Sequence, residues 1–156
     1  MTDESFLGYS LNAVDAKSRL SIPASYRDVI LARSEARSVV IGLAERAPCL
    51  VGYDRRRPVK LQSELEARFA GDFSEARDNH ARAAFGSSEL VPIDDTGRIV
   101  LSPMMKELGE IERFALFWGA GEYFEIWNPK LFLDMPGLDP RIARMVARQL
   151  EAKGEA

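Results

Sequence analysis

The sequence predicts an α+β fold that consists of two similar halves joined in one chain. Three observations predict it. A short motif occurs twice, 79 residues apart, at residues 15–23 and 94–103. Each copy is followed by a short helical pattern and then by two apolar runs that are typical of strands. Helical periodicity also fills the segment between the halves and the C-terminal segment, so helices and strands are both expected.

The first half is expected to run as strand, turn, strand, helix and hairpin. Residues 6–11 are extended in character and lead into the first motif. Pro23 suits the first position of a helix, where its missing N–H matters least, and apolar side chains then recur at helical spacing over 26–30. The apolar runs 39–43 and 49–53 follow and are separated by a short turn, which predicts a β-hairpin.

The middle of the chain, residues 58–86, predicts two helices. Leu61 and Leu65 are four residues apart and therefore lie on one face of the first helix. Asp72 and Glu75 have the spacing of a capping box, which indicates the start of a second, alanine-rich helix.

The second half is expected to repeat the order of the first. Residues 90–93 are extended, and Ser102 can cap a short helix after the second motif. The runs 114–118 and 123–127 predict another hairpin, because the four residues between them include two glycines. Residues 140–150 predict an amphipathic helix that packs on the body of the protein or on a neighbouring subunit.

Total charge argues against a nucleic-acid binder, but the distribution of charge does not. The chain has 156 residues and a formal net charge of −3, whereas nucleic-acid binders usually carry a basic excess. Residues 16–57 carry +5 and residues 58–95 carry −4. Screening limits electrostatic reach to about 8 Å at physiological salt, so the basic segment can act on its own.

The sequence gives little support for a catalytic site, a metal site or a membrane-spanning segment. The single Cys49 and single His80 exclude a disulfide framework and a two-histidine metal motif, and no cofactor is expected. Cys49 is expected to be a buried small hydrophobe, and His80 to lie on a solvated helix surface. Asp94 and Asp95 are expected to accept turn N–H groups rather than to perform acid–base catalysis. With no signal peptide and no apolar run of ~18–20 residues, we expect a cytoplasmic protein with no membrane partner and no small-molecule substrate, and not an enzyme.

The repeated turn is the feature most indicative of function. Gly97 tolerates the positive φ that tight turns often require, whereas Ser18 at the same place in the first copy does so less readily. The first turn would carry Lys17 and Arg19 near an exposed tip. Arginine can bind guanine or a phosphate through two parallel hydrogen bonds. The alternative is that each arginine pairs with the aspartate of its motif and supports the fold.

Both motifs resemble signatures of the MraZ family. The first reads D-A-K-S-R-L-S-I-P over residues 15–23 and is followed by Tyr26 and Arg27, and it closely resembles the family signature D-x-K-G-R-L-x-[IV]-P. The second, at residues 94–103, is similar to the family's second signature, including the extra residue before its proline. The resemblance covers residues 4–135.

The resemblance implies a fold of two AbrB-like swapped-hairpin halves that form a double-split β-barrel. It implies a single domain over residues 4–135, with repeat halves at about 4–57 and 87–131. The helices at 58–86 would then be an insert, and residues 136–156 a C-terminal helical tail.

The resemblance also implies a function. Members are bacterial transcriptional regulators that bind double-stranded DNA at short direct repeats upstream of the division and cell-wall gene cluster, as ring-like homo-oligomers at the nucleoid. The DNA-contacting positions carry over onto Lys17, Arg19 and Arg98. Ser18 replaces the family's glycine, and Thr96 leaves the second copy without a lysine. The first copy is therefore expected to contribute more to DNA binding.

Four further arginines are weaker candidates for contacts to the DNA backbone: Arg27, Arg55, Arg56 and Arg57. The alternative for the run of three is a solvated end of a strand. A different function class also stays open: a protein-interaction or scaffold ring without specific DNA binding, which the acidic middle segment and the amphipathic tail favour. A small enzyme is a third class, for which the sequence offers no candidate catalytic group.

Overall fold

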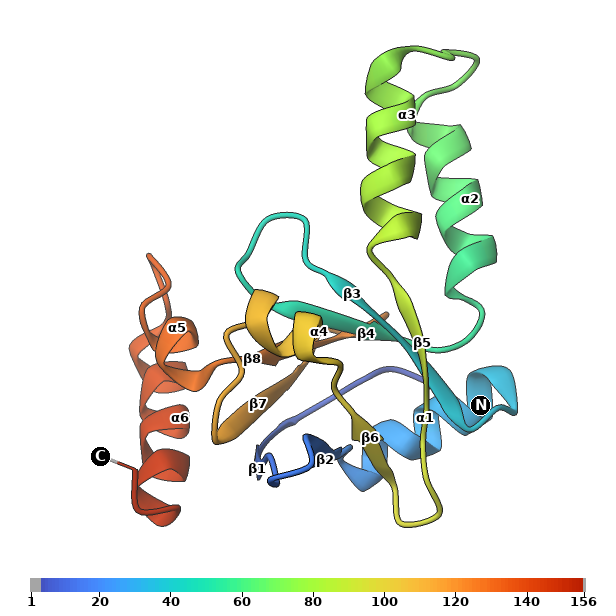
Figure 1. Cartoon of the computed structure of the whole chain (residues 1–156). Helices are drawn as coiled ribbons and strands as arrows, with labels where there is room; N and C mark the ends of the chain where they lie inside the picture. The colour runs from blue at the N-terminus through green and yellow to red at the C-terminus, as the bar shows by residue number, and fades with distance from the viewer. Residues whose placement is uncertain (1–3, 156) are drawn as a thin grey trace.

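An open six-stranded antiparallel sheet and a separate two-stranded ribbon form the β part of the protein (Figure 1). The structure is a computed structural model, and it describes residues 4–155. The strands in chain order are β1 (Tyr9–Ala13), β2 (Arg19–Ser21), β3 (Ser38–Leu43), β4 (Leu50–Tyr53), β5 (Glu89–Pro92), β6 (Arg98–Val100), β7 (Phe114–Gly119) and β8 (Phe124–Trp127). The large sheet has the order β1-β7-β8-β4-β3-β5, and β2 pairs with β6.

Helices surround this sheet and extend from it. In chain order they are α1 (Ala24–Ser34), α2 (Arg57–Arg68), α3 (Glu75–Ala81), the π-helical turn η1 (Arg82–Gly86), α4 (Pro103–Leu108), α5 (Pro129–Leu133) and α6 (Pro140–Ala152). Helices α2 and α3 project upward in Figure 1, away from the turn that joins β5 to β6. The α+β class is confirmed, as is the order of strand, turn, strand, helix and hairpin in each half.

The opening strand of each half pairs with the hairpin of the other half. Strand β1 runs antiparallel to β7, and β5 runs antiparallel to β3. In the ribbon, Arg19 of β2 faces Val100 and Arg98 of β6 faces Ser21. Because Arg19 and Arg98 occupy equivalent places in the two motifs, the ribbon is symmetric under exchange of the halves.

The double-split barrel implied by the resemblance is not confirmed. Strands β1 and β5 are the two edges of the six-stranded sheet, and they do not pair with each other, so the sheet stays open within one chain. The pairing across halves is therefore seen, whereas closure is not.

Two hydrophobic clusters cover opposite faces of the sheet. Phe117 belongs to the larger one, which joins α1, the ribbon and α4, while its neighbour Leu116 belongs to the smaller one. This alternation follows from the two-residue period of a strand. Val146 and Leu150 of α6 are buried in the smaller cluster, beside α5 and β1. The C-terminal helix therefore packs on its own body, one of the two outcomes expected for it.

One of the two predicted helix caps is confirmed and the other is wrong. Ser102 caps α4 as expected, since its Oγ accepts a hydrogen bond from the Met105 N–H at 3.2 Å. The capping box expected at Asp72 and Glu75 is wrong. The N-cap of α3 is Ser74, because Glu75 is already the first helical residue, and Asp72 instead accepts the Ser74 N–H at 2.9 Å.

Candidate nucleic-acid interface

The first repeated turn is organised by one carboxylate. Asp15 Oδ1 accepts hydrogen bonds from the backbone N–H groups of Lys17 and Arg19, both at 2.9 Å. Its Oδ2 accepts from Arg19 Nε at 2.6 Å. These hydrogen bonds, led by the one from the Arg19 backbone, lower the pKa of Asp15 below its ordinary value. Ser18 closes the turn at a φ of 61°, in the left-handed region that disfavours a side chain.

The second turn repeats this arrangement. Asp94 Oδ1 accepts from the backbone N–H groups of Thr96 and Arg98 at 2.9 Å, and Oδ2 accepts from Arg98 Nε at 3.0 Å. The same kind of hydrogen bond, first from the Arg98 backbone, lowers the pKa of Asp94 to about 2. Gly97 takes the left-handed position with a φ of 84°. The expected structural use is therefore confirmed for Asp94, whereas Asp95 accepts no turn N–H within residues 4–155 and pairs with Arg37 at 3.4 Å.

Arg19 and Arg98 each stabilise their turn and also keep N–H donors that are not used within the described chain. Arginine has five N–H donors, one on Nε and four on the two Nη atoms. In each turn the aspartate accepts a hydrogen bond from the Nε–H of its arginine. The Nη groups of Arg19 and Arg98 have no hydrogen-bond partner within residues 4–155, and the two side chains are 35% and 33% exposed. The aspartate therefore fixes the guanidinium plane and leaves the Nη donors available to an acceptor outside the chain.

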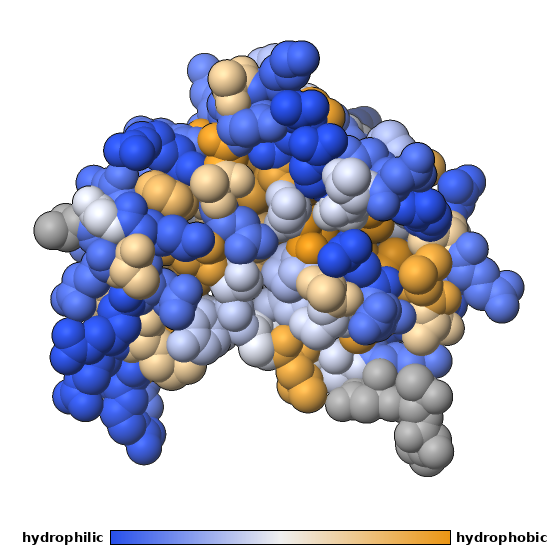
Figure 2. All heavy atoms as spheres, turned by 90° about the horizontal axis from the view of Figure 1, so that it is seen from below, coloured by the Kyte–Doolittle hydropathy of each residue, from blue (hydrophilic) through white to orange (hydrophobic). Residues whose placement is uncertain are grey.

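The ribbon brings the two arginines to one face. Leu20 and Ile99 point into the core, so the residues on either side of them point outward. Arg19 and Arg98 are diagonal neighbours across the antiparallel pair, a relation that typically separates residues by about 7–8 Å. Figure 2 views the molecule from below, the side of the β5–β6 turn, where hydrophilic side chains predominate between separate apolar patches.

Backbone hydrogen bonds connect the tip of each turn to the other motif. The Ser18 carbonyl accepts the Leu101 N–H, and the Gly97 carbonyl accepts the Ile22 N–H, both at 3.0 Å. Lys17 lies at the first tip and is exposed. The structure therefore places Lys17, Arg19 and Arg98 on one rigid unit formed by β2, β6 and their turns.

Arg27 lies against the second turn instead of standing free. A Cβ atom added at Gly97 would lie 2.4 Å from Arg27 Nη1, so the guanidinium occupies the space that a side chain at 97 would need. Arg27 Nε is buried and has no hydrogen-bond partner in the described chain. The role of this arginine at the turn was not expected from the sequence.

The run of three arginines is separate from the ribbon. Arg56 Nε bonds to Asp54 at 3.0 Å, Arg57 pairs with Glu64 at 3.0 Å, and Arg55 is exposed. The run precedes and begins α2, which leaves the sheet on the side opposite the β5–β6 turn (Figure 1). The structure therefore does not bring these residues together with Arg19 and Arg98.

Lys106 is a residue of this surface that sequence reasoning missed. It belongs to α4 of the second half, and its Nζ lies 3.2 Å from Ser18 Oγ of the first turn. The two residues are 88 apart in sequence. No local pattern could have paired them, because the contact depends on how β2 and β6 align.

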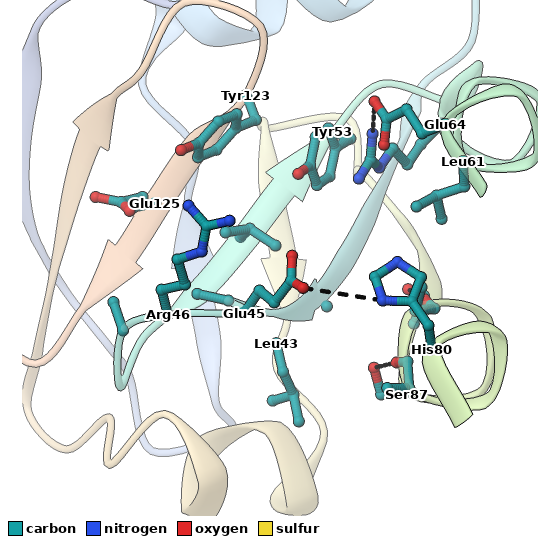
Figure 3. Close-up of a pocket in the computed structure, with 18 of the residues that line it drawn as sticks. Leu43, Glu45, Arg46, Tyr53, Leu61, Glu64, His80, Ser87, Tyr123 and Glu125 are labelled. Atoms are coloured by element: carbon teal, nitrogen blue, oxygen red, sulfur yellow. Dashed lines mark hydrogen bonds and ion pairs between the residues drawn. The ribbon is translucent and has the colours of Figure 1, made fainter. Parts of the chain in front are cut away.

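A groove of about 620 Å³ lies between the β3–β4 turn, α2 and the end of α3 (Figure 3). Tyr53 and Tyr123 lie on one side of it, and Glu45 pairs with Arg68 at 3.0 Å and lies 3.8 Å from His80. His80 was expected on a solvated surface, but its side chain is 23% exposed and lines this groove. Among the described residues there is no cluster of three or more potential metal ligands. The charged groups named here pair with one another, as in structural ion pairs.

Cys49 is buried and free, as expected, directly before β4. Burial raises the pKa of its thiol, which keeps it protonated. No helix in the described part of the chain combines the length and apolar character that crossing a membrane requires.

The chain is similar to curated transcriptional regulators. No protein-family model matches it. It is 34% identical over 119 residues to the transcriptional regulator MraZ of Methylobacillus flagellatus, covering 76% of this chain and 77% of that protein. It is 33% identical over 127 residues to the MraZ of Rickettsia akari, covering 81% and 83%, and 32% identical over 126 residues to that of Gluconacetobacter diazotrophicus, covering 80% and 78%. With this identity over about four fifths of its length, the chain belongs to the MraZ family of transcriptional regulators.

Proposed function

We propose that this protein is a sequence-specific DNA-binding transcriptional regulator that contacts DNA through Lys17, Arg19 and Arg98. One observation carries the proposal: the two arginines share the outer face of the β2–β6 ribbon, and each has an aspartate on Nε and free Nη donors. The major groove is about 12 Å wide and admits a two-stranded ribbon. In this arrangement the Nη groups reach guanine edges or phosphates, and Lys17 contacts the backbone.

Membership of the MraZ family supports the target class that we propose. The proposed sites are short direct repeats upstream of the division and cell-wall gene cluster, bound by a ring-like homo-oligomer at the nucleoid in the cytoplasm. The DNA-binding unit is the domain of residues 4–135, with 136–156 as a helical tail. A net charge of −3 predicts modest affinity for one site. Several subunits on spaced repeats would raise overall avidity by ~10²–10⁴.

The test measures binding of purified full-length protein to a duplex with the direct repeats and to a shuffled duplex of equal length. Arg19→Ala is expected to weaken binding to the repeats by about 5- to 150-fold, since a bidentate arginine–base contact contributes about 1–3 kcal/mol. Arg98→Ala is expected to weaken it less. Arg148→Ala is the matched control, because Arg148 also pairs with a nearby carboxylate but lies on α6.

The outcomes separate the two function classes. Preference for the repeats that is lost in Arg19→Ala and kept in Arg148→Ala supports the proposal. Unchanged affinity of Arg19→Ala would remove that residue from the interface. Equal, weak binding of the wild type to both duplexes would favour a protein-interaction ring, for which the groove beside Tyr53 and Tyr123 offers a surface.

A further inference from the structure

The first turn receives a cation from the other half of the chain. Helix α4 begins directly after Ser102, and its fourth residue, Lys106, extends to the first turn. Lys106 Nζ donates a hydrogen bond to Ser18 Oγ at 3.2 Å. The side chain of Lys106 is thus directed to the tip formed by Lys17 and Ser18, and it is partly buried.

The ammonium group keeps most of its hydrogen-bonding capacity. An ammonium has three N–H donors, and Ser18 accepts one of them. No carboxylate lies within ion-pair distance of Lys106 or of Lys17 in the described chain, whereas Arg19 has Asp15. Two cations without an ion pair in the described chain therefore belong to this turn: Lys17 within the turn itself and Lys106 through its hydrogen bond to Ser18.

The Ser18 hydroxyl also has an unused donor, its own proton. A serine hydroxyl donates one hydrogen bond and accepts up to two. Its oxygen accepts from Lys106, and among residues 4–155 no acceptor takes its proton. The ammonium and the hydroxyl therefore present donors at one place, and both are suited to the oxygen of an anion.

We propose that Lys106 and the Ser18 hydroxyl together bind a backbone phosphate of double-stranded DNA, a contact that rests on the proposed function. Lysine binds phosphate as a point charge, and a hydroxyl adds a neutral donor to the same oxygen. Ser18 thereby gains a role at a position where its φ of 61° is unfavourable for a residue with a side chain. Phosphate contacts carry no base information, so this site sets affinity and register and not sequence preference.

The competing explanation is a brace that only holds the turn in place. Salt dependence distinguishes the two, because each phosphate neutralised changes the slope of log K against log salt by about 0.9. A brace would alter affinity through the arginines and leave the number of neutralised phosphates unchanged. The slope therefore reports on the phosphate itself.

The experiment measures binding of full-length wild type, Lys106→Met and Lys130→Met to the repeat duplex and the shuffled duplex over a series of salt concentrations. Methionine keeps the apolar stem of Lys106, and a thermal melt of each variant checks folding. Lys130 of α5 is the matched control, since it is exposed, has no ion pair in the described structure and gives the same charge change. Lys106→Met is expected to lower the slope on both duplexes by about 0.9 for each subunit that contacts the DNA, and Lys130→Met to leave it unchanged.

Two further variants test the charge and the hydroxyl separately. Lys106→Arg keeps the charge and is expected to keep the slope. Ser18→Ala, which retains the charge at the tip, is expected to weaken binding to both duplexes by the same factor. A wild-type slope in Lys106→Met, or an unchanged affinity in Ser18→Ala, would overturn the shared phosphate site. If Arg19→Ala still weakens repeat binding in that case, the proposed function stands and only this site fails.

Discussion

Gly97 and Ser18 occupy equivalent left-handed positions, yet the two residues have different neighbours. Gly97 lies against the Arg27 guanidinium, while Ser18 carries a hydroxyl that Lys106 meets. The positive φ of both turns could be predicted, because each turn is local and the motif repeats. The neighbours could not be predicted, since Arg27 and Lys106 each come from the other half.

Gly97→Ala is expected to destabilise the protein by about 1–3 kcal/mol, the usual cost of a side chain in a sparsely populated backbone region. Displacement of Arg27 adds to this cost, because the new Cβ would lie 2.4 Å from Nη1. Chemical denaturation of Gly97→Ala, Arg27→Ala and the double variant measures both effects. A smaller cost of Gly97→Ala in the Arg27→Ala background would identify the contact, and strict additivity would contradict it.

At the scale of elements, local sequence signals predicted the strands and most of the helices. The pairing of strands from different halves could not be predicted from such local signals. The glycines between β7 and β8 and the proline at the start of α4 are local signals that the structure follows. Helix α5 was not predicted, although the Asn128-Pro129 pair is a local signal for the start of a helix. Asn128 is the N-cap of α5, and its Oδ1 accepts a hydrogen bond from the Lys130 N–H at 2.9 Å.

Helix α6 offers an element-scale prediction. Leu150 is 7% exposed and packs in the smaller hydrophobic cluster, whereas Met145 on the same helix is 38% exposed. Leu150→Ala is expected to lower the free energy of unfolding by about 2–5 kcal/mol, since it removes buried methyl groups and leaves a cavity. Met145→Ala is the control and is expected to change it by less than about 0.5 kcal/mol. Equal effects in urea denaturation would mean that α6 is not held by this face.

At the scale of the whole molecule, Arg33 connects segments that are far apart in sequence. Its Nη1 bonds to Asp54 at 3.2 Å and to the Glu122 carbonyl at 2.7 Å, and its Nε bonds to the Glu4 carbonyl at 2.7 Å. Both side chains of the Arg33–Asp54 pair are 4% exposed. Burial by itself would raise the pKa of Asp54, but hydrogen bonds from Arg56 and Arg33 outweigh it and the pKa is lowered. The sequence showed no sign of this connection.

Arg33→Met is expected to destabilise the fold by about 3–5 kcal/mol, because it leaves the buried Asp54 carboxylate without one of its partners. Arg37→Met is the matched control, since the Arg37–Asp95 pair is solvent-exposed and such pairs contribute about 0–1 kcal/mol. Urea denaturation of both variants measures the difference. A loss in Arg33→Met no larger than in Arg37→Met would show that the carboxylate of Asp54 is satisfied without Arg33.

The pairing of each opening strand with the opposite hairpin has a consequence for synthesis. Strand β1 needs partners in β7 that are translated 101 to 109 residues later. At a synthesis rate of roughly 5–20 residues per second, β1 waits for about 5–20 seconds before its partner leaves the ribosome. Contacts of such long sequence separation also slow folding. During that interval the nascent first half has an unpaired strand, which makes it a candidate for chaperone binding during translation.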